Sequence, residues 1–169
     1  MKKFKLTSEF IVDISGVKLF RIKALIEFGN VKAGDLGGYI EKEENLSHMG
    51  NAWVSGNAQV SGDARVSGNA RVSGDAQVFG DARVSGNAQV FGDARVSGDK
   101  DYAYAHGFGS CNRTTTFFRL KDGDVGVRCG CFYGTLAQFR DNVCETHGET
   151  KKAQEYLMLA DLMDFRFKN

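Results

Sequence analysis

Three cysteines and one histidine near the C-terminus have the types and spacing of metal ligands. Cys129 and Cys131 are two residues apart at the end of an expected strand, so their side chains point the same way. Cys144 and His147 are three residues apart at the end of an expected helix, so they share a face. Three sulfurs and one imidazole form the ligand set of a closed structural zinc site. The pattern therefore predicts Zn²⁺ bound by these four side chains.

The same residues have other interpretations. Their spacing is not that of a standard zinc finger, and reduced cysteines are common in small hydrophobic cores. His106 and Cys111 are reserve ligands for the fourth position. A nucleophile–base pairing of Cys144 with His147 is conceivable, but no third group that would orient the histidine is evident. We therefore predict no catalytic residue, and zinc binding and buried thiols stay open as alternatives.

Two strands and two helices are expected to position these side chains. The residue types predict strands over 114–120 and 125–132. Thr135 and Gln138 have the spacing of a capping box, so a helix is expected to begin there. A second helix is predicted from about Thr150 to Phe165 by its apolar periodicity. The C-terminal piece is therefore expected to be a small α+β module of ββαα order.

A six-residue repeat fills the chain from residue 51 to residue 98. Its pattern is [Asn/Asp]-Ala-x-Val-[Ser/Phe]-Gly, and eight units follow one another without a gap. Ala and Val point to one side of a very short strand, while x and Ser or Phe point to the other. Gly followed by Asn or Asp tolerates the positive φ of a sharp corner. No unit can bury its own valine, so the units are expected to stack.

A second, longer period predicts three units per coil. Asn51, Asn69 and Asn87 match in type at the corners, and Gln59 matches Gln77 on the outside. Each of these matches is between residues three units apart. Three units per coil place such residues directly above one another, and eight units make nearly three coils. The chain resembles the left-handed β-helix of hexapeptide-repeat proteins, and the left hand is an implication of that resemblance.

The residues before the repeat are expected to form a cap. A bare β-helix end is an unpaired sheet edge, so strands expected at 3–7 and 17–22 must cover it. The unit at 45–50 is expected to keep the phase, with Leu46 at the alanine position and His48 as a packing residue at the valine position. The predicted fold is mainly β, with three parts: an N-terminal β cap (1–44), a left-handed parallel β-helix of about three coils (45–99) and the α+β module (100–169).

Four outward side chains of the β-helix are candidates for contacts with a partner. Trp53 and Arg71 lie one coil apart on one face and could stack as a cation–π pair. Phe79 and Phe91 replace serine on the outside, and we expect another segment or a partner chain to cover them. The alternative is that they are scattered surface apolar residues. A homo-oligomer also stays open, because trimers are common among left-handed β-helices.

Composition and charge exclude several classes of protein. The 22 Lys and Arg residues nearly balance the 21 Asp and Glu residues, so direct nucleic-acid binding is not expected. The 21 glycines occur without any proline, which excludes collagen. No apolar run approaches the roughly 18 residues of a membrane helix, and the first ten residues lack the apolar core of a secretory signal. We therefore expect a cytoplasmic protein.

Several motifs resemble uncharacterised phage and prophage proteins with hexapeptide-like repeats. They are Asp35-Leu-Gly-Gly-Tyr-Ile-Glu41, Asn51-Ala-Trp-Val54, Thr114-Thr-Thr-Phe-Phe-Arg119, Cys129-Gly-Cys-Phe132 and Thr146-His-Gly148. The resemblance extends over the whole chain and implies a phage-encoded protein of the bacterial host cytoplasm. Cys129, Cys131 and His147 are among the features that the C-terminal module shares with those proteins. The resemblance implies no established activity.

From that family context we expect a non-catalytic inhibitor that binds a host defence protein, of the anti-CRISPR type that blocks a Cas effector. A rigid prism with flat faces and a separate head suits protein recognition. One alternative is a structural or assembly protein that self-associates through its flat sides. Another is an acyl- or sugar-modifying transferase of the hexapeptide-repeat class, although the eight regular units lack the histidine that such enzymes place near the coils.

Overall fold

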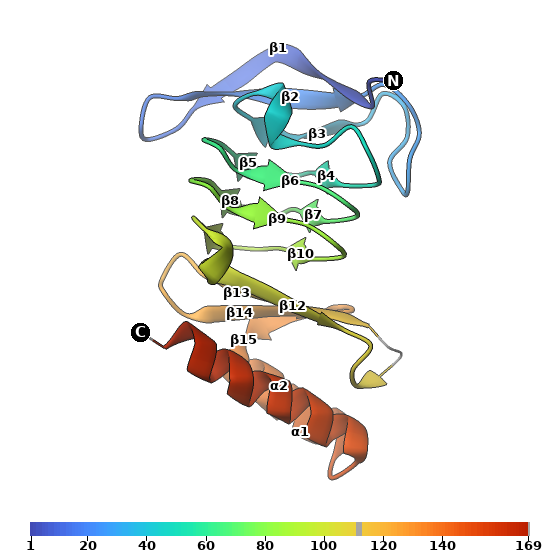
Figure 1. The fold of residues 1–169 in the computed structure, drawn as a ribbon, viewed down its shortest axis with the longest axis vertical. Helices are drawn as coiled ribbons and strands as arrows, with labels where there is room; N and C mark the ends of the chain where they lie inside the picture. Colours follow the sequence, from blue (N-terminus) through green and yellow to red (C-terminus); the bar gives the residue numbers. More distant parts are fainter. Residues whose placement is uncertain (111–112, 169) are drawn as a thin grey trace.

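The computed structural model describes residues 1–110 and 113–168. Three parts follow one another along the long axis of the molecule, with an N-terminal cap at one end and two helices at the other (Figure 1). The cap contains β1 (Phe4–Val12), β2 (Lys18–Ala24) and β3 (Leu36–Ile40). β1 and β2 form an antiparallel hairpin, and β3 pairs antiparallel with β2 on one side and parallel with β5 of the repeat on the other. The expected β cap is therefore present, and it continues a sheet of the repeat.

Eight two-residue strands form the β-solenoid that the repeat predicts. Strands three units apart stack in parallel, as Val54 on Val72 and Val72 on Val90. Each alanine and valine of the eight units is buried in one continuous core. The strands are β4 (Trp53–Val54), β5 (Gln59–Val60), β6 (Arg65–Val66), β7 (Arg71–Val72), β8 (Gln77–Val78), β9 (Arg83–Val84), β10 (Gln89–Val90) and β11 (Arg95–Val96).

Three faces result, and we number them here. Face 1 contains β3, β5, β8 and β11, face 2 contains β6 and β9, and face 3 contains β4, β7 and β10. In Figure 1, face 2 is turned toward the viewer and the other two recede on either side. The predicted arrangement of about three coils with three corners each is confirmed.

The first turn departs from the predicted phase. Leu46 forms a parallel bridge with Val66, whereas the predicted phase would set it against Ala64. Leu46 therefore lies at the level of the valines, and its placement at the alanine position was wrong. The physical reason is that two extra residues lie between Ser47 and the corner at Asn51. Ser47 donates its backbone N–H to the carbonyl of Val66 in the next coil, and Asn51 donates its backbone N–H to the carbonyl of Gly68.

His48 is one of the residues displaced by this change of phase. It does not enter the solenoid interior, as the hexad pattern predicted. Its ring stacks on Phe4 with the centroids 4.3 Å apart. The backbone N–H of Lys3 donates to Nδ1 at 3.1 Å, and Nε2 lies 2.7 Å from a carboxylate oxygen of Glu43. His48 is a packing residue as predicted, but in the cap.

The C-terminal module has two more strands than predicted. Its antiparallel sheet contains β12 (Tyr102–His106), β13 (Thr114–Arg119), β14 (Val125–Cys129) and β15 (Phe132–Thr135). The single strand expected over 125–132 is a hairpin, because Gly130 adopts a φ of 58° and reverses the chain. The helices are α1 (Leu136–His147) and α2 (Lys151–Phe167), and the expected capping box of Thr135 and Gln138 begins α1.

The module closes the second end of the solenoid. Leu120 forms an antiparallel bridge with Ala94, and Phe118 is buried in the solenoid core. The Tyr133 hydroxyl accepts the backbone N–H of Asp93 at 3.3 Å. A second core lies between the sheet and the two helices. Both ends of the solenoid are therefore covered by the chain itself.

Candidate functional site

A cavity of about 540 Å³ lies between the C-terminal sheet and its helices. Cys129, Cys131 and His147 line it together with Tyr156 and Arg113. Strand β14 ends at Cys129, the turn before β15 carries Cys131, and the last turn of α1 carries His147. The structure thus brings three of the four predicted zinc ligands to one cavity.

Cys144 is the predicted ligand that the structure keeps apart. The buried stripe of α1 runs through Leu136, Phe139 and Val143, and His147 continues that stripe. Cys144 follows Val143 by one residue, which turns it about 100° away, and it is exposed. Within residues 1–110 and 113–168, no three His, Cys, Asp or Glu side chains are placed to hold a metal ion. The predicted four-ligand set is therefore not assembled, and zinc binding stays a prediction.

The reserve ligands do not complete the set. His106 is exposed on β12, and its Nδ1 lies 2.9 Å from the Thr114 hydroxyl on the neighbouring strand. Cys111 lies outside the described residues. The thiol of Cys129 accepts a hydrogen bond from the Thr115 hydroxyl at 3.3 Å, and both residues are buried. The alternative of a buried thiol thus describes Cys129, whereas Cys131 is exposed.

The catalytic pairing considered for Cys144 and His147 is not formed. No hydrogen bond joins the two side chains in the described part of the chain, and the His147 ring lies 5.7 Å from the Tyr156 ring. His48 has hydrogen-bond partners at both ring nitrogens, so neither is free to accept a proton from a substrate.

Arg113 is a cavity residue that the sequence did not single out. Its guanidinium occupies the space beside the Cα of Gly130, where a Cβ would clash with it. Gly130 thus serves the positive φ of the turn and the close approach of the arginine. Burial raises the pKa of the Tyr156 hydroxyl, which accepts the backbone N–H of Ser110 at 2.9 Å. The Arg113 guanidinium and the Tyr156 hydroxyl add polar groups to the cavity lining.

The chain itself covers most of the predicted partner contacts on face 3. Trp53 is only 4% exposed, and Phe28 packs edge-on against it at 5.4 Å. Arg71 pairs with Trp53 in the ladder but lies against Gly29, so the predicted cation–π stack is absent from the contacts of the described residues. Phe91 is covered by Tyr133 at 5.0 Å and by Arg128 at 4.5 Å. Trp53 therefore packs against the cap, and Phe91 packs against the C-terminal module.

Phe79 is the remaining candidate. It lies half-buried on face 1, where the guanidinium of Arg95 stacks over its ring at 5.2 Å. The expectation that another segment covers the outward phenylalanines is confirmed for Phe91, and Phe79 is covered in part by its own face.

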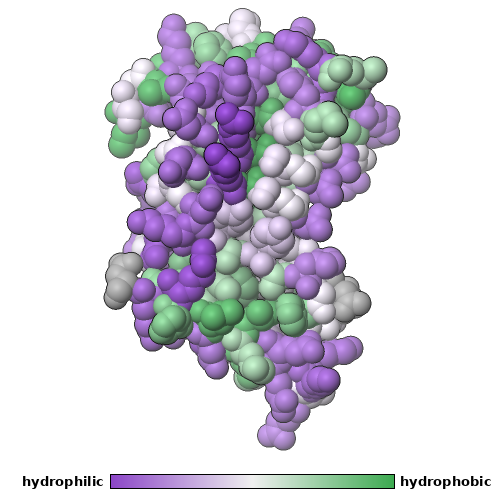
Figure 2. Space-filling model, in the orientation of Figure 1, coloured by the Kyte–Doolittle hydropathy of each residue, from purple (hydrophilic) through white to green (hydrophobic). Residues whose placement is uncertain are grey.

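An apolar stripe on α2 is the surface that the sequence analysis missed. Met158, Leu162 and Phe165 are 71%, 54% and 80% exposed. They are spaced four and three residues apart, so they lie on one side of the helix. The opposite side is buried through Ala153, Tyr156, Ala160, Met163 and Phe167. Figure 2 shows hydrophobic side chains gathered in a band over the C-terminal part of the molecule, where α2 lies. Two apolar stripes in one helix were readable from the sequence.

Comparisons with known proteins concern the repeat. The family model described as YdcK Beta solenoid repeat matches residues 58–74, 64–78, 76–90 and 88–99. No curated protein matches the chain. The matched residues all lie in the stacked hexads, so they support a repeat β-solenoid protein. In the described part of the chain, no helix is long and apolar enough to cross a membrane.

Proposed function

We propose that this chain is a non-catalytic protein-binding module that presents the outer side of α2 to another protein. The observation that carries the proposal is the exposed stripe of Met158, Leu162 and Phe165, which no segment of the described chain covers. Contiguous exposed apolar side chains on a soluble protein usually mark a contact surface. In the spacing of four and three residues, such a stripe fits into an apolar groove.

Unpaired charges beside the stripe indicate the chemistry of the partner. Asp161 is paired with Arg140 at 2.6 Å and Asp164 with Lys168 at 3.1 Å, so these carboxylates are neutralised within the module. Lys151 and Lys152 are exposed at the start of the helix, and no ion pair of theirs is present in the described structure. We infer a partner with an apolar groove and carboxylates on its rim.

A second copy of this chain fits the stripe less well. An antiparallel pair of α2 helices that sets Met158 against Leu162 of the copy would set Lys152 at the level of Lys168 of the copy. Two positive charges that face each other across such a helix pair oppose association. Since both ends of the solenoid are capped, end-to-end stacking of copies is also blocked. These arguments favour a different protein over self-assembly.

The test compares the wild type with a Met158→Ser/Leu162→Ser/Phe165→Ser variant. Both proteins are used in crosslinking and affinity purification from cells of the source organism, followed by binding measurements with the purified captured protein. We expect one stoichiometric complex with the wild type and at least a hundredfold loss of affinity with the variant, since each exposed side chain buries apolar area only in the complex.

The matched control is Ile14→Ser, which removes a 99% exposed apolar side chain from the tip of the β1–β2 hairpin. This control is expected to bind like the wild type. Equal binding by the triple variant would reject the α2 stripe, and a wild-type dimer at micromolar concentration would assign the stripe to a second copy instead.

The finer form of this function is an inhibitor encoded by a phage that blocks a Cas effector, and it is supported by the resemblance of the sequence motifs alone. Its test is plating efficiency of a CRISPR-sensitive phage on a host that expresses the chain. Protection that disappears with the triple variant supports it. A protective effect that survives the triple variant would separate this function from the α2 stripe.

A further inference from the structure

We propose that the cavity of the C-terminal module binds a small planar organic anion. The cavity measures about 540 Å³, within the range of roughly 300–1,000 Å³ for small-molecule sites. Its walls come from four parts of the chain: Ser110 and Arg113 before β13, the hairpin between β14 and β15, the inner side of α1, and Tyr156 of α2. This site is separate from the outer side of α2 and does not depend on the function proposed above.

The charge of the lining favours an anion. Arg113 and His147 are the basic side chains of the wall, and no Asp or Glu lines the cavity among the described residues. The two residues outside the described part, 111 and 112, are Cys and Asn, so neither adds a carboxylate. A guanidinium without a carboxylate partner is a fixed positive charge suited to carboxylate or phosphate. The same guanidinium opposes a metal cation at this place.

The acid next to Tyr156 in the sequence is already engaged elsewhere. Glu155 precedes Tyr156 on α2, and its carboxylate accepts the backbone N–H of Gly109 at 2.7 Å. No ion pair of Arg113 is present in the described structure, whereas Arg119 and Arg140 in the same module each pair with an aspartate. Arg113 is therefore a guanidinium of the cavity lining that has no carboxylate partner in the described structure and remains available to a ligand.

Aromatic side chains form the rest of the wall. Phe132 packs on Phe139 at 5.6 Å, and Phe139 packs edge-on against Tyr156 at 5.6 Å. Ring edges and faces in such a cluster accept a planar ring by stacking. Asn142 and Thr146 add amide and hydroxyl groups from α1. The combination fits a flat ring with one carboxylate or phosphate directed toward Arg113.

The choice of probes distinguishes a carboxylate from a phosphate as the anionic group of the ligand. Isothermal titration calorimetry of the full chain is performed with adenosine 5′-monophosphate, adenosine, salicylate, salicyl alcohol and inorganic phosphate. We expect binding by the monophosphate, by salicylate or by both, at least about tenfold weaker binding by the uncharged counterpart of each, and weak binding by phosphate alone. Equal affinity for the charged and uncharged member of both pairs would overturn the proposal. The absence of binding by every probe at roughly 5 mM, the range of weak millimolar affinity, would also overturn it.

The variants are Arg113→Gln and, as a matched control, Arg140→Gln. Both remove one guanidinium from the module, but Arg140 does not line the cavity. We expect Arg113→Gln to weaken binding of the best probe about tenfold or more and Arg140→Gln to leave it unchanged. An equal effect of both variants would show general electrostatics and overturn the site. Stoichiometric zinc that the wild type retains and Cys131→Ser loses would assign the cavity to the metal instead.

Discussion

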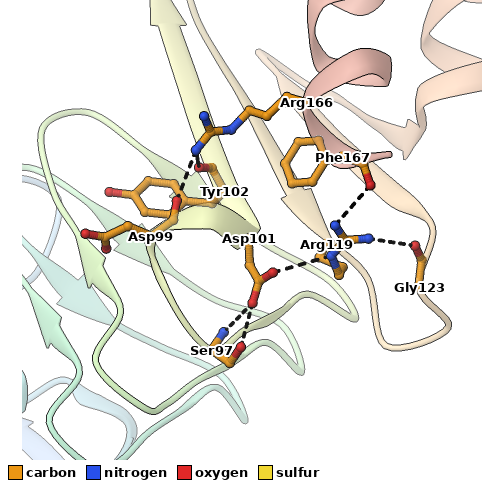
Figure 3. A network of polar contacts seen from close by, with 8 residues as sticks. All are labelled: Ser97, Asp99, Asp101, Tyr102, Arg119, Gly123, Arg166 and Phe167. Atoms are coloured by element: carbon orange, nitrogen blue, oxygen red, sulfur yellow. Dashed lines mark hydrogen bonds and ion pairs between the residues drawn. The ribbon is translucent and has the colours of Figure 1, made fainter. Parts of the chain in front are cut away.

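The carboxylate of Asp101 forms an ion pair with Arg119 at 3.4 Å, which joins the last corner of the solenoid to β13 (Figure 3). Asp101 lies in the short 3-10 helix η2 (Asp99–Asp101) and is buried. Its other carboxylate oxygen accepts the backbone N–H of Ser97 at 2.9 Å and the Ser97 hydroxyl at 2.6 Å. Arg119 also donates to the carbonyl of Phe167 at 3.1 Å. The Asp101–Arg119 pair therefore connects the solenoid, the sheet and the end of α2.

Asp101→Asn is expected to destabilise the chain by about 1–3 kcal/mol, because the half-buried Arg119 loses its charged partner. Burial by itself raises the pKa of Asp101, but the bonds from Ser97 and Arg119 outweigh it, so the pKa is below its ordinary value. The stabilisation is therefore present above about pH 4 and is lost as the pH falls through the folded-state pKa. Urea unfolding from pH 7 to pH 3 measures this.

The control for this prediction is Asp141→Asn, which changes an exposed carboxylate of α1. We expect its unfolding free energy to follow the wild type at each pH. If the difference between the wild type and Asp101→Asn stayed constant from pH 7 to pH 3, the ionised carboxylate would not be the source of the stabilisation.

Lys3 is a second charged side chain that we expect to change the free energy of unfolding with pH. It is buried beneath the cap, where its ammonium donates to the carbonyl of Ala52 at 2.8 Å and stacks over Phe28 at 4.6 Å. Burial lowers its pKa to about 8. Between pH 8 and pH 10.5 the unfolded chain binds a proton that the folded chain has released, so stability rises with pH.

We expect the wild type to gain up to about 3 kcal/mol relative to Lys3→Met over that range. Chemical denaturation at pH 7.5 and pH 9.5 captures part of the gain. Lys5→Met, which changes an exposed lysine of β1, should show no such relative change. A stability difference between the wild type and Lys3→Met that falls with rising pH would contradict the assignment.

Asn45 replaces backbone pairing where the first turn lacks a strand on face 2. Its buried amide donates to the carbonyls of Gly62 at 3.1 Å and Ala64 at 2.8 Å, and its oxygen accepts the N–H of Lys42 at 2.9 Å. Asn45→Asp is expected to cost about 3 kcal/mol or more, because a carboxylate has no N–H for the two carbonyls. Thermal unfolding would show it, and Asn57→Ala, at an exposed corner, should cost about 0.5 kcal/mol or less.

The sequence predicted the solenoid well because its information is local and repeated. Val at every sixth residue and matching corners at every third unit are sufficient to define the stack, and each copy repeats the same physical argument. The first turn could not be predicted in the same way. Leu46 lies in a fragment, residues 45–50, that imitates the hexad. Its true level is decided by the two residues added before Asn51 and by the cap that displaces His48.

The candidate site was predicted only in part for a similar reason. Cys129 and Cys131 were placed by strand alternation, but Gly130 forms a turn and leaves one thiol buried and the other exposed. Arg113 enters the cavity through tertiary packing against that glycine, which no spacing rule contains. The stripe at Met158, Leu162 and Phe165 could be predicted from helical periodicity alone. A helix that packs against one core needs a single apolar side, and α2 has a second one.

Removal of one coil tests the stacking directly. Deletion of residues 69–86 joins Gly68 to Asn87, which reproduces the Gly-Asn corner found in the intact chain at Gly68 and Asn69. The ladder would then pair Val54 with Val90, each of which pairs with Val72 in the intact chain. We expect a folded protein that unfolds cooperatively at a lower temperature, because stability in a solenoid is nearly a sum over coils. Small-angle X-ray scattering should show a long axis shorter by about 4.8 Å.

Deletion of residues 69–83 is the matched control, since it removes two and a half units instead of three and joins Gly68 to Val84. The remaining units then leave the six-residue phase, so a valine would occupy a corner that requires Asn or Asp. A side chain at this place faces water instead of the column of buried valines, and the coils on either side lose their continuous core. We expect this variant to aggregate or to lack cooperative unfolding by circular dichroism. If both deletions folded equally well, the stacked-valine column would not be what holds the coils in register.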